Sequence, residues 1–159
     1  MALKLVRVDD RLIHGQVGFV WLRAIGADMF LVIDDPTAKN EFLRDVLIDG
    51  HPQGTTVEVC TVEDGATRMK ELSTTPNGVF VIMKSPITAK RLRDMGVEFD
   101  LLNVGGMGAG PGRSKIYKNI SAGPAEMEAM RALEAMGTKV EFRIVPDERS
   151  VTFSSLDKK

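Results

Sequence analysis

Short apolar runs alternate with segments of helical spacing along nearly the whole chain, and this alternation constrains the fold more than any other feature. Strands are expected near residues 3–8, 29–33, 56–60, 79–83, 99–104 and 139–145, with helices near 16–25, 36–49, 62–72, 87–95 and 124–136. The run at 29–33 is apolar throughout, which is typical of a strand covered on both faces. The order predicts an α/β fold: a mostly parallel central sheet with helices on both faces.

The boundaries of several segments follow from capping residues and glycines. The second helix is expected to begin at Pro36, with Asp35 as its N-cap, and to end at Gly50. Its buried face would consist of four apolar residues: Phe42, Leu43, Val46 and Leu47. Residues 116–120 suggest one further short strand, and the structure of residues 146–159 is left open. Because the chain has no linker, repeat or low-complexity segment, we expect residues 1–159 to form a single domain.

The charge balance and the cysteine count exclude several classes of protein. The chain of 159 residues carries 21 Lys and Arg against 22 Asp and Glu, a formal net charge of −1, so it does not bind nucleic acid through a basic domain. Its single cysteine, Cys60, excludes an internal disulfide, suits a reducing cytoplasm and is expected to be a buried small hydrophobe. No segment resembles a signal peptide or a membrane span, so we expect a cytoplasmic protein without direct membrane insertion.

Chemically capable residues gather where the strands are expected to end. Parallel α/β sheets bind ligands at the carboxyl ends of their strands, near the point where the winding reverses. The first strand leads into a charged loop that ends in a histidine and a glycine, residues 7–16. Later strand ends contribute Lys84 and Ser85, the glycine-rich residues 105–112 with Arg113, and Arg143.

His14 is the stronger of the two imidazole candidates, because His51 lies in a polar turn and is assigned no role. Free backbone N–H groups and the helix dipole would favour an anion beside His14. Imidazole can act as a covalent nucleophile, and Arg11 could pair with a phosphate as a planar fork of donors. From the residues alone, a histidine that caps the helix or bonds to the backbone is slightly favoured.

The two neighbouring aspartates have two interpretations each. Asp10 could orient the imidazole by accepting a hydrogen bond from one of its ring nitrogens, or it could serve only the structure of the loop. Asp9 is expected to form an ion pair with Arg7 or Arg11.

Two segments of the chain resemble a known family. Residues 6–17, Val-Arg-Val-Asp-Asp-Arg-Leu-Ile-His-Gly-Gln-Val, resemble the N-terminal signature of the IIB components of the mannose/fructose/sorbose family of the phosphoenolpyruvate:sugar phosphotransferase system. Residues 103–107, Asn-Val-Gly-Gly-Met, followed by Arg113 and Ile116, form a second match. The similarity runs in order across roughly the whole chain.

The resemblance implies a phosphotransferase that needs no cofactor and no metal. A IIA phosphocarrier protein or domain would pass a phosphoryl group from its own phosphohistidine to Nδ1 of His14, and the membrane components IIC and IID would present the sugar. Arg11 matches the basic residue that steadies the group. Further contacts to phosphate or partner are expected from Gly15, Gln16, Arg7, Lys84, Ser85, Arg113 and Arg143. Because the membrane components select the sugar, the resemblance names none, and it leaves a homo-oligomer open.

The residues also permit two other classes of function. A receiver-like or phosphatase-like domain would bind Mg²⁺ through Asp9, Asp10 and Asp34 and would be phosphorylated on an aspartate. A non-catalytic small-molecule-binding module would use residues 105–112, which we otherwise expect to form a flexible wall of the site. That stretch lacks the Gly-Lys-Ser/Thr end of a P-loop and the spacing of a dinucleotide fingerprint.

Overall fold

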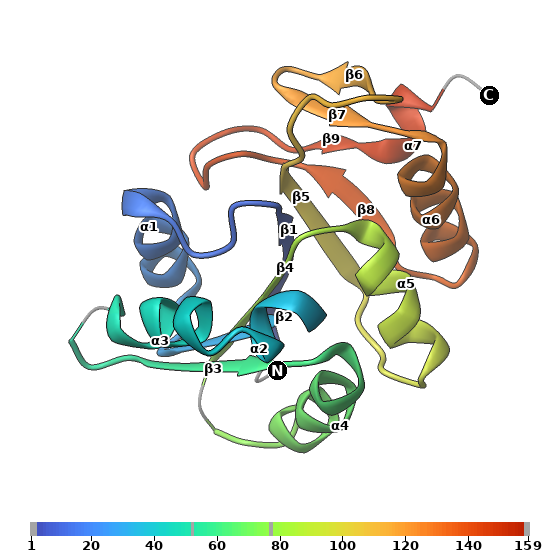
Figure 1. Cartoon of the computed structure of the whole chain (residues 1–159). Coiled ribbons are helices and arrows are strands. Elements are labelled where there is room, and N and C mark those ends of the chain that lie inside the picture. The colour runs from blue at the N-terminus through green and yellow to red at the C-terminus, as the bar shows by residue number, and fades with distance from the viewer. Residues whose placement is uncertain (1–2, 52, 77, 158–159) are drawn as a thin grey trace.

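A seven-stranded sheet in the order β3-β2-β4-β1-β5-β8-β9 forms the centre of the protein in a computed structural model, which describes residues 3–51, 53–76 and 78–157 (Figure 1). The strands are β1 (Leu3–Asp9), β2 (Met29–Ile33), β3 (Thr56–Cys60), β4 (Val79–Met83), β5 (Leu101–Gly106), β8 (Lys139–Phe142) and β9 (Val151–Thr152). All neighbouring strands pair in parallel except β8 and β9. The predicted α/β class and mostly parallel sheet are confirmed.

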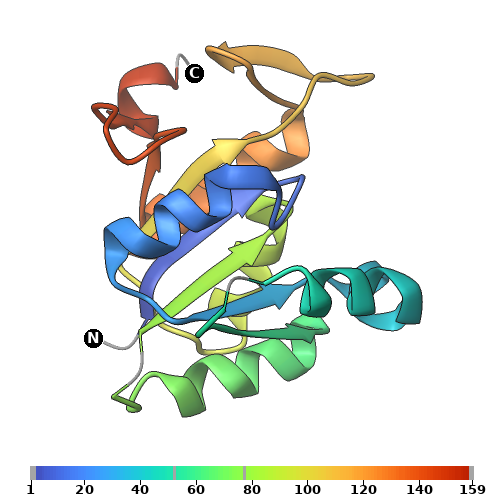
Figure 2. The same ribbon diagram turned by 90° about the vertical axis from the view of Figure 1, so that its left-hand side faces the viewer.

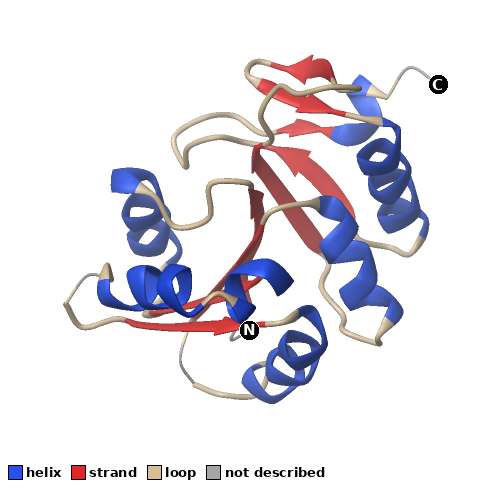
Figure 3. Cartoon of the chain, in the orientation of Figure 1, coloured by secondary structure: helices blue, strands red, loops and turns tan. Residues whose placement is uncertain are grey.

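Helices cover both faces of the sheet (Figures 1 and 3). They are α1 (Gly15–Ile25), α2 (Asp35–Lys39), α3 (Glu41–Asp49), α4 (Val62–Leu72), α5 (Pro86–Asp94), α6 (Pro124–Ala135) and α7 (Phe153–Leu156). On one face, α1 packs on a cluster that includes Phe30 and Phe80. On the other, α4, α5, α6 and α7 pack on a larger cluster that includes Leu31 and Val81. Successive residues of β2 and β4 thus face opposite layers, which explains why both strands are apolar throughout.

The loop after β1 lies at the point where the winding of the sheet reverses. Strand β1 pairs with β4 on one side and with β5 on the other, and the chain passes from β1 to β2 on the β4 side before it crosses to β5. In Figure 2 the arrowheads of β2 and β4 point the same way, and the loop after β1 emerges at that edge of the sheet. Ligands of open α/β sheets bind at such a position.

The helix expected from Pro36 to Gly50 is two helices. Asp34, rather than the predicted Asp35, caps α2, because its carboxylate accepts a hydrogen bond from the Thr37 N–H at 3.2 Å. Asn40 is extended and starts α3 by accepting a hydrogen bond from the Leu43 N–H at 3.1 Å. An Asn side chain that caps a new helix competes with continuation of the old one.

The break also overturns the predicted buried face of this region. Phe42 is 74% exposed, and Leu43 and Val46 are exposed as well. Only Leu47, which is half-buried, packs against the cluster under α1. Because the helix breaks at Asn40, α3 starts with a new orientation and most of these apolar side chains point to solvent.

The second half of the chain differs from the sequence-based expectation in two further places. Instead of one strand at 116–120, a hairpin forms from β6 (Ser114–Tyr117) and β7 (Ile120–Ala122), and Lys118 in its turn has φ +47°. The tail, left open above, forms β9 and α7, where the buried Phe153 packs near Phe142 with ring centroids 6.3 Å apart. Within the described ranges, no helix has both the length and the apolar character needed to cross a membrane.

Candidate functional site

The loop between β1 and α1 is tightly turned and anchored by one leucine. Leu12 adopts a left-handed conformation with φ +58°, and its N–H donates to the Asp9 carbonyl at 2.9 Å. The Leu12 side chain is buried in the cluster under α1. A left-handed conformation is costly for a residue with a Cβ, so this burial holds the chain in a shape that it would otherwise avoid. The turn places His14 at the N-cap position of α1.

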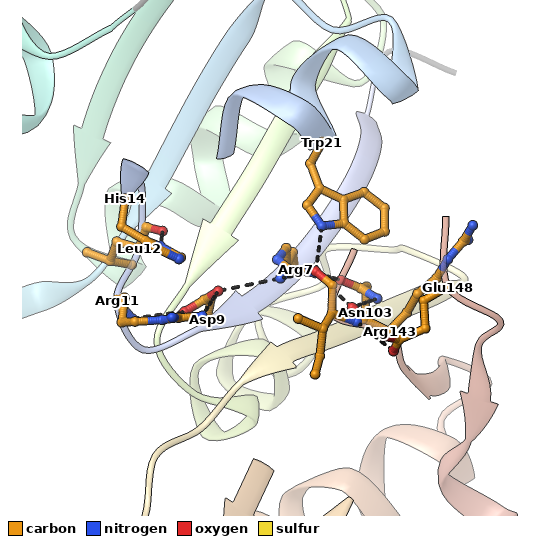
Figure 4. Close-up of polar contacts among 10 residues, drawn as sticks. Arg7, Asp9, Arg11, Leu12, His14, Trp21, Asn103, Arg143 and Glu148 are labelled. Carbon is orange, nitrogen blue, oxygen red and sulfur yellow. Dashed lines mark hydrogen bonds and ion pairs between the residues drawn. The ribbon is translucent and has the colours of Figure 1, made fainter. Parts of the chain in front are cut away.

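The imidazole of His14 is folded back against its own loop, an arrangement that we call closed (Figure 4). Its Nδ1 lies 2.9 Å from the Leu12 carbonyl oxygen, and its Nε2 is buried without a hydrogen-bond partner in the described part of the chain. When Nδ1 carries the proton, it donates to Leu12 and leaves the lone pair on Nε2. Both ring nitrogens are therefore covered in this arrangement.

The N-terminus of α1, which follows His14, is suited to bind an anion. His14 occupies the N-cap position with extended backbone, φ −146° and ψ 136°, and its side chain makes no capping hydrogen bond. The first turn of α1 contains no acidic residue. Uncapped N–H groups and the positive end of the helix dipole favour a bound anion.

Arg11 is held on the same loop by a buried carboxylate. Its Nε donates to Asp9 Oδ1 at 3.2 Å and its Nη2 to Oδ2 at 3.4 Å, while its backbone N–H donates to Oδ1 at 3.1 Å. Asp9 has no exposed side-chain surface, whereas the Arg11 side chain is 51% exposed. The guanidinium is thus fixed at its inner edge and open to solvent elsewhere. The expectation that Asp9 pairs with Arg7 or Arg11 is confirmed, since it pairs with both.

Arg7 is buried, although a contact with phosphate or partner was expected from it. It is only 1% exposed, and its guanidinium donates to Asn103 Oδ1 at 2.5 Å and to the carbonyl oxygens of Arg143 at 2.9 Å and Ile144 at 3.0 Å. The guanidinium carbon also lies 4.9 Å from the ring centroid of Trp21. Burial lowers the pKa of Arg7 to about 10, although the neighbouring Asp9 raises it. The burial does not fit the expected contact with phosphate or partner, because β1 directs this side chain into the interior.

Two glycines of the downstream motif make room for these buried charges. A Cβ on Gly105 would fall 2.0 Å from Nη2 of Arg7, and a Cβ on Gly106 would fall 2.6 Å from Oδ1 of Asp9. Both glycines lie in β5, beside β1. Residues 105–107 are buried, so only the part of the glycine-rich stretch from residue 108 onward is exposed, as the expected wall of the site would be. Sequence reasoning missed this role, although the motif at 103–107 carried the signal.

Arg143 contacts Trp21 and its own segment of the chain. Its guanidinium carbon is 5.6 Å from the Trp21 ring centroid, and its Nη2 donates to the Pro146 carbonyl. Trp21 Nε1 donates to the Ile144 carbonyl at 2.9 Å. The Arg143 side chain therefore helps to fold residues 143–148 against α1 (Figure 4).

Glu148 also holds residues 143–148 in their folded arrangement. Its Oε1 accepts from the Ile144 N–H at 3.2 Å, and its Oε2 accepts from Lys118 Nζ at 3.0 Å. Burial raises the pKa of Glu148, but the hydrogen bonds from Lys118, Ile144 and Tyr117 outweigh that effect and lower it.

The two candidate residues that follow β4 have structural partners. Lys84 follows β4, and its Nζ lies 3.6 Å from Oδ2 of Asp34. Ser85 caps α5 by accepting a hydrogen bond from the Ile87 N–H at 3.1 Å. Because β4 neighbours β1, Lys84 ends one strand away from the His14 loop, and its side chain is 42% exposed.

Asp10 contacts the glycine-rich segment. Its Oδ2 accepts a hydrogen bond from the Gly108 N–H at 2.7 Å, which favours the second of its two interpretations, a role in the structure of the loop. Arg113 Nη1 donates to the Gly108 carbonyl at 2.8 Å, and its Nε lies 3.3 Å from Glu126 Oε1. Asp10 and Arg113 thus fasten the glycine-rich segment to the His14 loop and to α6.

The remaining candidates have simple outcomes. Gly15 starts α1 with φ +47°, a conformation that favours glycine. The side chain of Gln16 lies outside the described residues. His51 is exposed and Cys60 is half-buried, so the expected full burial of Cys60 was wrong. Its position at the end of β3 explains this, since β3 is an edge strand.

The three aspartates of the magnesium alternative have other partners. Asp9 binds two arginines, Asp10 binds the Gly108 N–H, and Asp34 accepts from Thr37 Oγ1 at 2.6 Å and pairs with Lys84. A receiver-like site needs such carboxylates turned toward one cation. The geometry favours an anion at His14 instead.

Comparisons with known proteins agree with this geometry. The family model described as "PTS system sorbose subfamily IIB component" matches residues 3–159. The sorbose-specific EIIB component of Klebsiella pneumoniae is 32% identical over 158 residues, with 99% of this chain and 95% of the relative covered. The mannose-specific EIIAB component of Escherichia coli strain K12 is 28% identical, and this chain spans 48% of its length.

Solved structures show the same likeness in three dimensions. The crystal structure of the IIBSor domain of the sorbose permease from Klebsiella pneumoniae superposes with a TM-score of 0.91 at 31% identity, covering 98% of this chain and 95% of that one. An N-acetylgalactosamine-specific IIB component from Escherichia coli gives a TM-score of 0.87 at 27% identity, covering 93% and 97%. By sequence and by fold, the chain belongs to the sorbose-subfamily IIB components of the sugar phosphotransferase system.

Proposed function

We propose that His14 receives a phosphoryl group from the phosphohistidine of a IIA protein or domain and passes it to a sugar presented by membrane IIC and IID components. IIB components are phosphotransferases of sugar transport and work with IIA and the membrane components. One observation carries the assignment of the residue: His14 lies at the uncapped N-terminus of α1, on the same loop as a half-exposed arginine.

Two kinds of donor would hold the phosphoryl group at this place. The N–H groups of the first turn of α1 point toward the bound oxygens, and the helix dipole adds favourable potential. Arg11 supplies a permanent positive charge with planar N–H donors that match a phosphoryl group. Transfer between two imidazoles depends chiefly on positioning and on stabilisation of the charge on the transferring group.

The two transfers balance without any further reactant. In the first, the N–P bond of the IIA phosphohistidine breaks, its electron pair stays on the donor imidazole, and a new N–P bond forms on His14. In the second, a sugar hydroxyl oxygen attacks phosphorus and its proton passes to solvent, while the N–P bond breaks and leaves its electron pair on the His14 nitrogen. The His14 imidazole is regenerated in its neutral form.

Phosphorylation of Nδ1, the atom that the resemblance implies, requires the imidazole to turn. In the closed arrangement Nδ1 faces the Leu12 carbonyl at 2.9 Å, and a protonated Nδ1 has no lone pair to offer phosphorus. We infer that the ring swings away from Leu12 and transfers the proton to Nε2 before Nδ1 attacks. The protein would do this at the cytoplasmic side of the membrane, where the permease presents its sugar.

Phosphorylation of the His14→Ala variant by a phosphorylated IIA partner tests the assignment. We expect incorporation of phosphate to disappear in His14→Ala and to stay unchanged in His51→Ala, which removes the exposed imidazole. The phosphoprotein should lose its phosphate in acid and keep it in base and in hydroxylamine. Phosphorylation of His14→Ala, or a base-labile phosphate, would instead support phosphorylation on an aspartate.

A further inference from the structure

The Arg11 guanidinium depends on a residue that takes no part in the chemistry itself. Asp9 is fully buried, and both of its carboxylate oxygens accept hydrogen bonds from Arg11, at 3.1 and 3.2 Å for Oδ1 and at 3.4 Å for Oδ2. An arginine side chain on a surface loop normally samples many rotamers, and holding one of them costs conformational entropy. A rigid buried acceptor removes much of this freedom before the phosphoryl group arrives.

The Asp9 carboxylate is itself held in place by a second arginine, Arg7. Arg7 Nη2 lies 3.4 Å from its Oδ2, and Arg7 in turn is bound to Asn103 and to two backbone carbonyls of residues 143–144. Gly106 lies opposite Asp9 in the β1–β5 register and leaves space for its carboxylate. The position of Asp9 is therefore set by β1, β5 and the 143–148 segment together.

We propose that Asp9 is a positioning residue for phosphoryl transfer, which holds the Arg11 guanidinium in the orientation that the phosphoryl group of His14 requires. The inference rests on the proposed function, because it assumes that Arg11 contacts that group. It separates the two aspartates of the loop: Asp9 acts through Arg11, whereas Asp10 binds the Gly108 N–H. Asp9 contacts neither phosphorus nor imidazole and is not a catalytic residue.

A double-mutant cycle with potassium phosphoramidate, a small phosphoryl donor, tests the inference without a partner protein. The rate of phosphohistidine formation is measured for the unaltered chain, Asp9→Asn, Arg11→Ala and the double variant. We expect each single variant to be slower by at least about tenfold. We expect the double variant to equal Arg11→Ala within about twofold, because Asp9 has nothing to position once Arg11 is removed.

The inference would be overturned if the fold decrease in rate of the double variant equalled the product of the two single decreases. Asp9 would then act independently of Arg11. Glu58→Gln provides the matched control. It removes a carboxylate that binds Arg68 through two hydrogen bonds of 2.7 Å, between β3 and α4. The phosphorylation rate of this variant should stay unchanged.

A measurement on the unaltered chain covers the case in which Asp9→Asn does not fold. The Nε–H of Arg11 should exchange with solvent more slowly than that of the exposed Arg44 in ¹H–¹⁵N NMR spectra, because its proton is bound to a buried carboxylate. Equal exchange of the two groups would overturn the inference. Phosphorylation of His14→Ala by phosphoramidate at the rate of the unaltered chain would contradict the proposed function instead, so the two failures are distinguishable.

Discussion

The guanidinium of Arg7 occupies the space that a side chain on Gly105 would need: a Cβ at that position would fall 2.0 Å from Nη2 and 2.1 Å from the central guanidinium carbon. The two residues are 98 positions apart in the sequence and lie on the neighbouring strands β1 and β5. The charged loop signature and the distant glycine motif therefore form one packed unit. This relationship makes the stability of the site sensitive to single methyl groups.

We expect Gly105→Ala to lower the free energy of unfolding by more than about 3 kcal/mol, because Arg7 must leave a buried set of partners. Gly18→Ala in α1 is the matched control. Its added methyl would meet Ile13 Cγ2 at 3.5 Å, an ordinary contact, so it should stabilise the protein by about 0.5 kcal/mol. Urea denaturation measures both. Equal effects of the two substitutions would contradict the packed unit.

At position 12, the glycine variant should be more stable than the alanine variant, the reverse of the order expected for ordinary backbone conformations. Leu12→Ala removes a buried side chain and should cost about 2–4 kcal/mol. Leu12→Gly removes the same side chain but relieves the left-handed backbone at φ +58°, so it should be more stable than Leu12→Ala by about 1 kcal/mol. Denaturant midpoints of the two variants decide this. A less stable glycine variant would show that the left-handed turn carries no strain.

The closed imidazole should react slowly with a small electrophile. Diethylpyrocarbonate modifies an unprotonated ring nitrogen that it can reach, and both nitrogens of His14 are covered. We expect His14 to be modified about tenfold more slowly than the exposed His51, since reaction requires the ring to turn outward first. Peptide mass spectrometry at several times gives both rates in one sample. Faster modification of His14 would rule out the closed arrangement as the resting state.

The ion pair between Glu58 and Arg68 should stabilise the protein only above acidic pH. The hydrogen bonds from Arg68 lower the pKa of Glu58 from its ordinary value of 4.5, against the effect of burial. A carboxyl whose pKa is lower in the folded state stabilises the fold above its unfolded value and loses this contribution as the pH falls through the folded value.

Glu58→Gln should therefore lower the free energy of unfolding at pH 7, and by less than about 1 kcal/mol, because both partners are more than a third exposed. The difference between the variant and the unaltered chain should shrink toward zero near pH 3. Urea denaturation at the two pH values measures it, and a difference of the same size at both would exclude this ion pair as its origin.

The layers of the fold were predictable because their signals are local. The apolar runs of β2 and β4 need no knowledge of their neighbours to be recognised as buried strands. The break between α2 and α3 was missed because Asn40 is compatible with a helix interior, and only its capping bond to Leu43 shows otherwise. The outward turn of Phe42 follows from that break and could not be inferred from apolar spacing.

The site was predictable in part. The position of His14 at a strand-to-helix junction followed from the order of elements, whereas the burial of Arg7 did not, since a charged residue in a loop signature suggests exposure. Its partners Asn103 and Ile144 are distant in the sequence. The same holds for Asp10, whose partner Gly108 is brought near only by the pairing of β1 with β5.

The contact between His14 Nδ1 and the Leu12 carbonyl has a thermodynamic consequence for sugar uptake. If the phosphoryl group goes to Nδ1, as we propose, the hydrogen bond at 2.9 Å exists only in the dephosphorylated protein. Each transfer to sugar then allows the bond to reform, so the free energy of the bond adds to the driving force of that step. The hydrogen bond stabilises the dephosphorylated protein and thereby raises the phosphoryl-transfer potential of the phosphorylated protein. It therefore favours transfer of the phosphoryl group to the sugar.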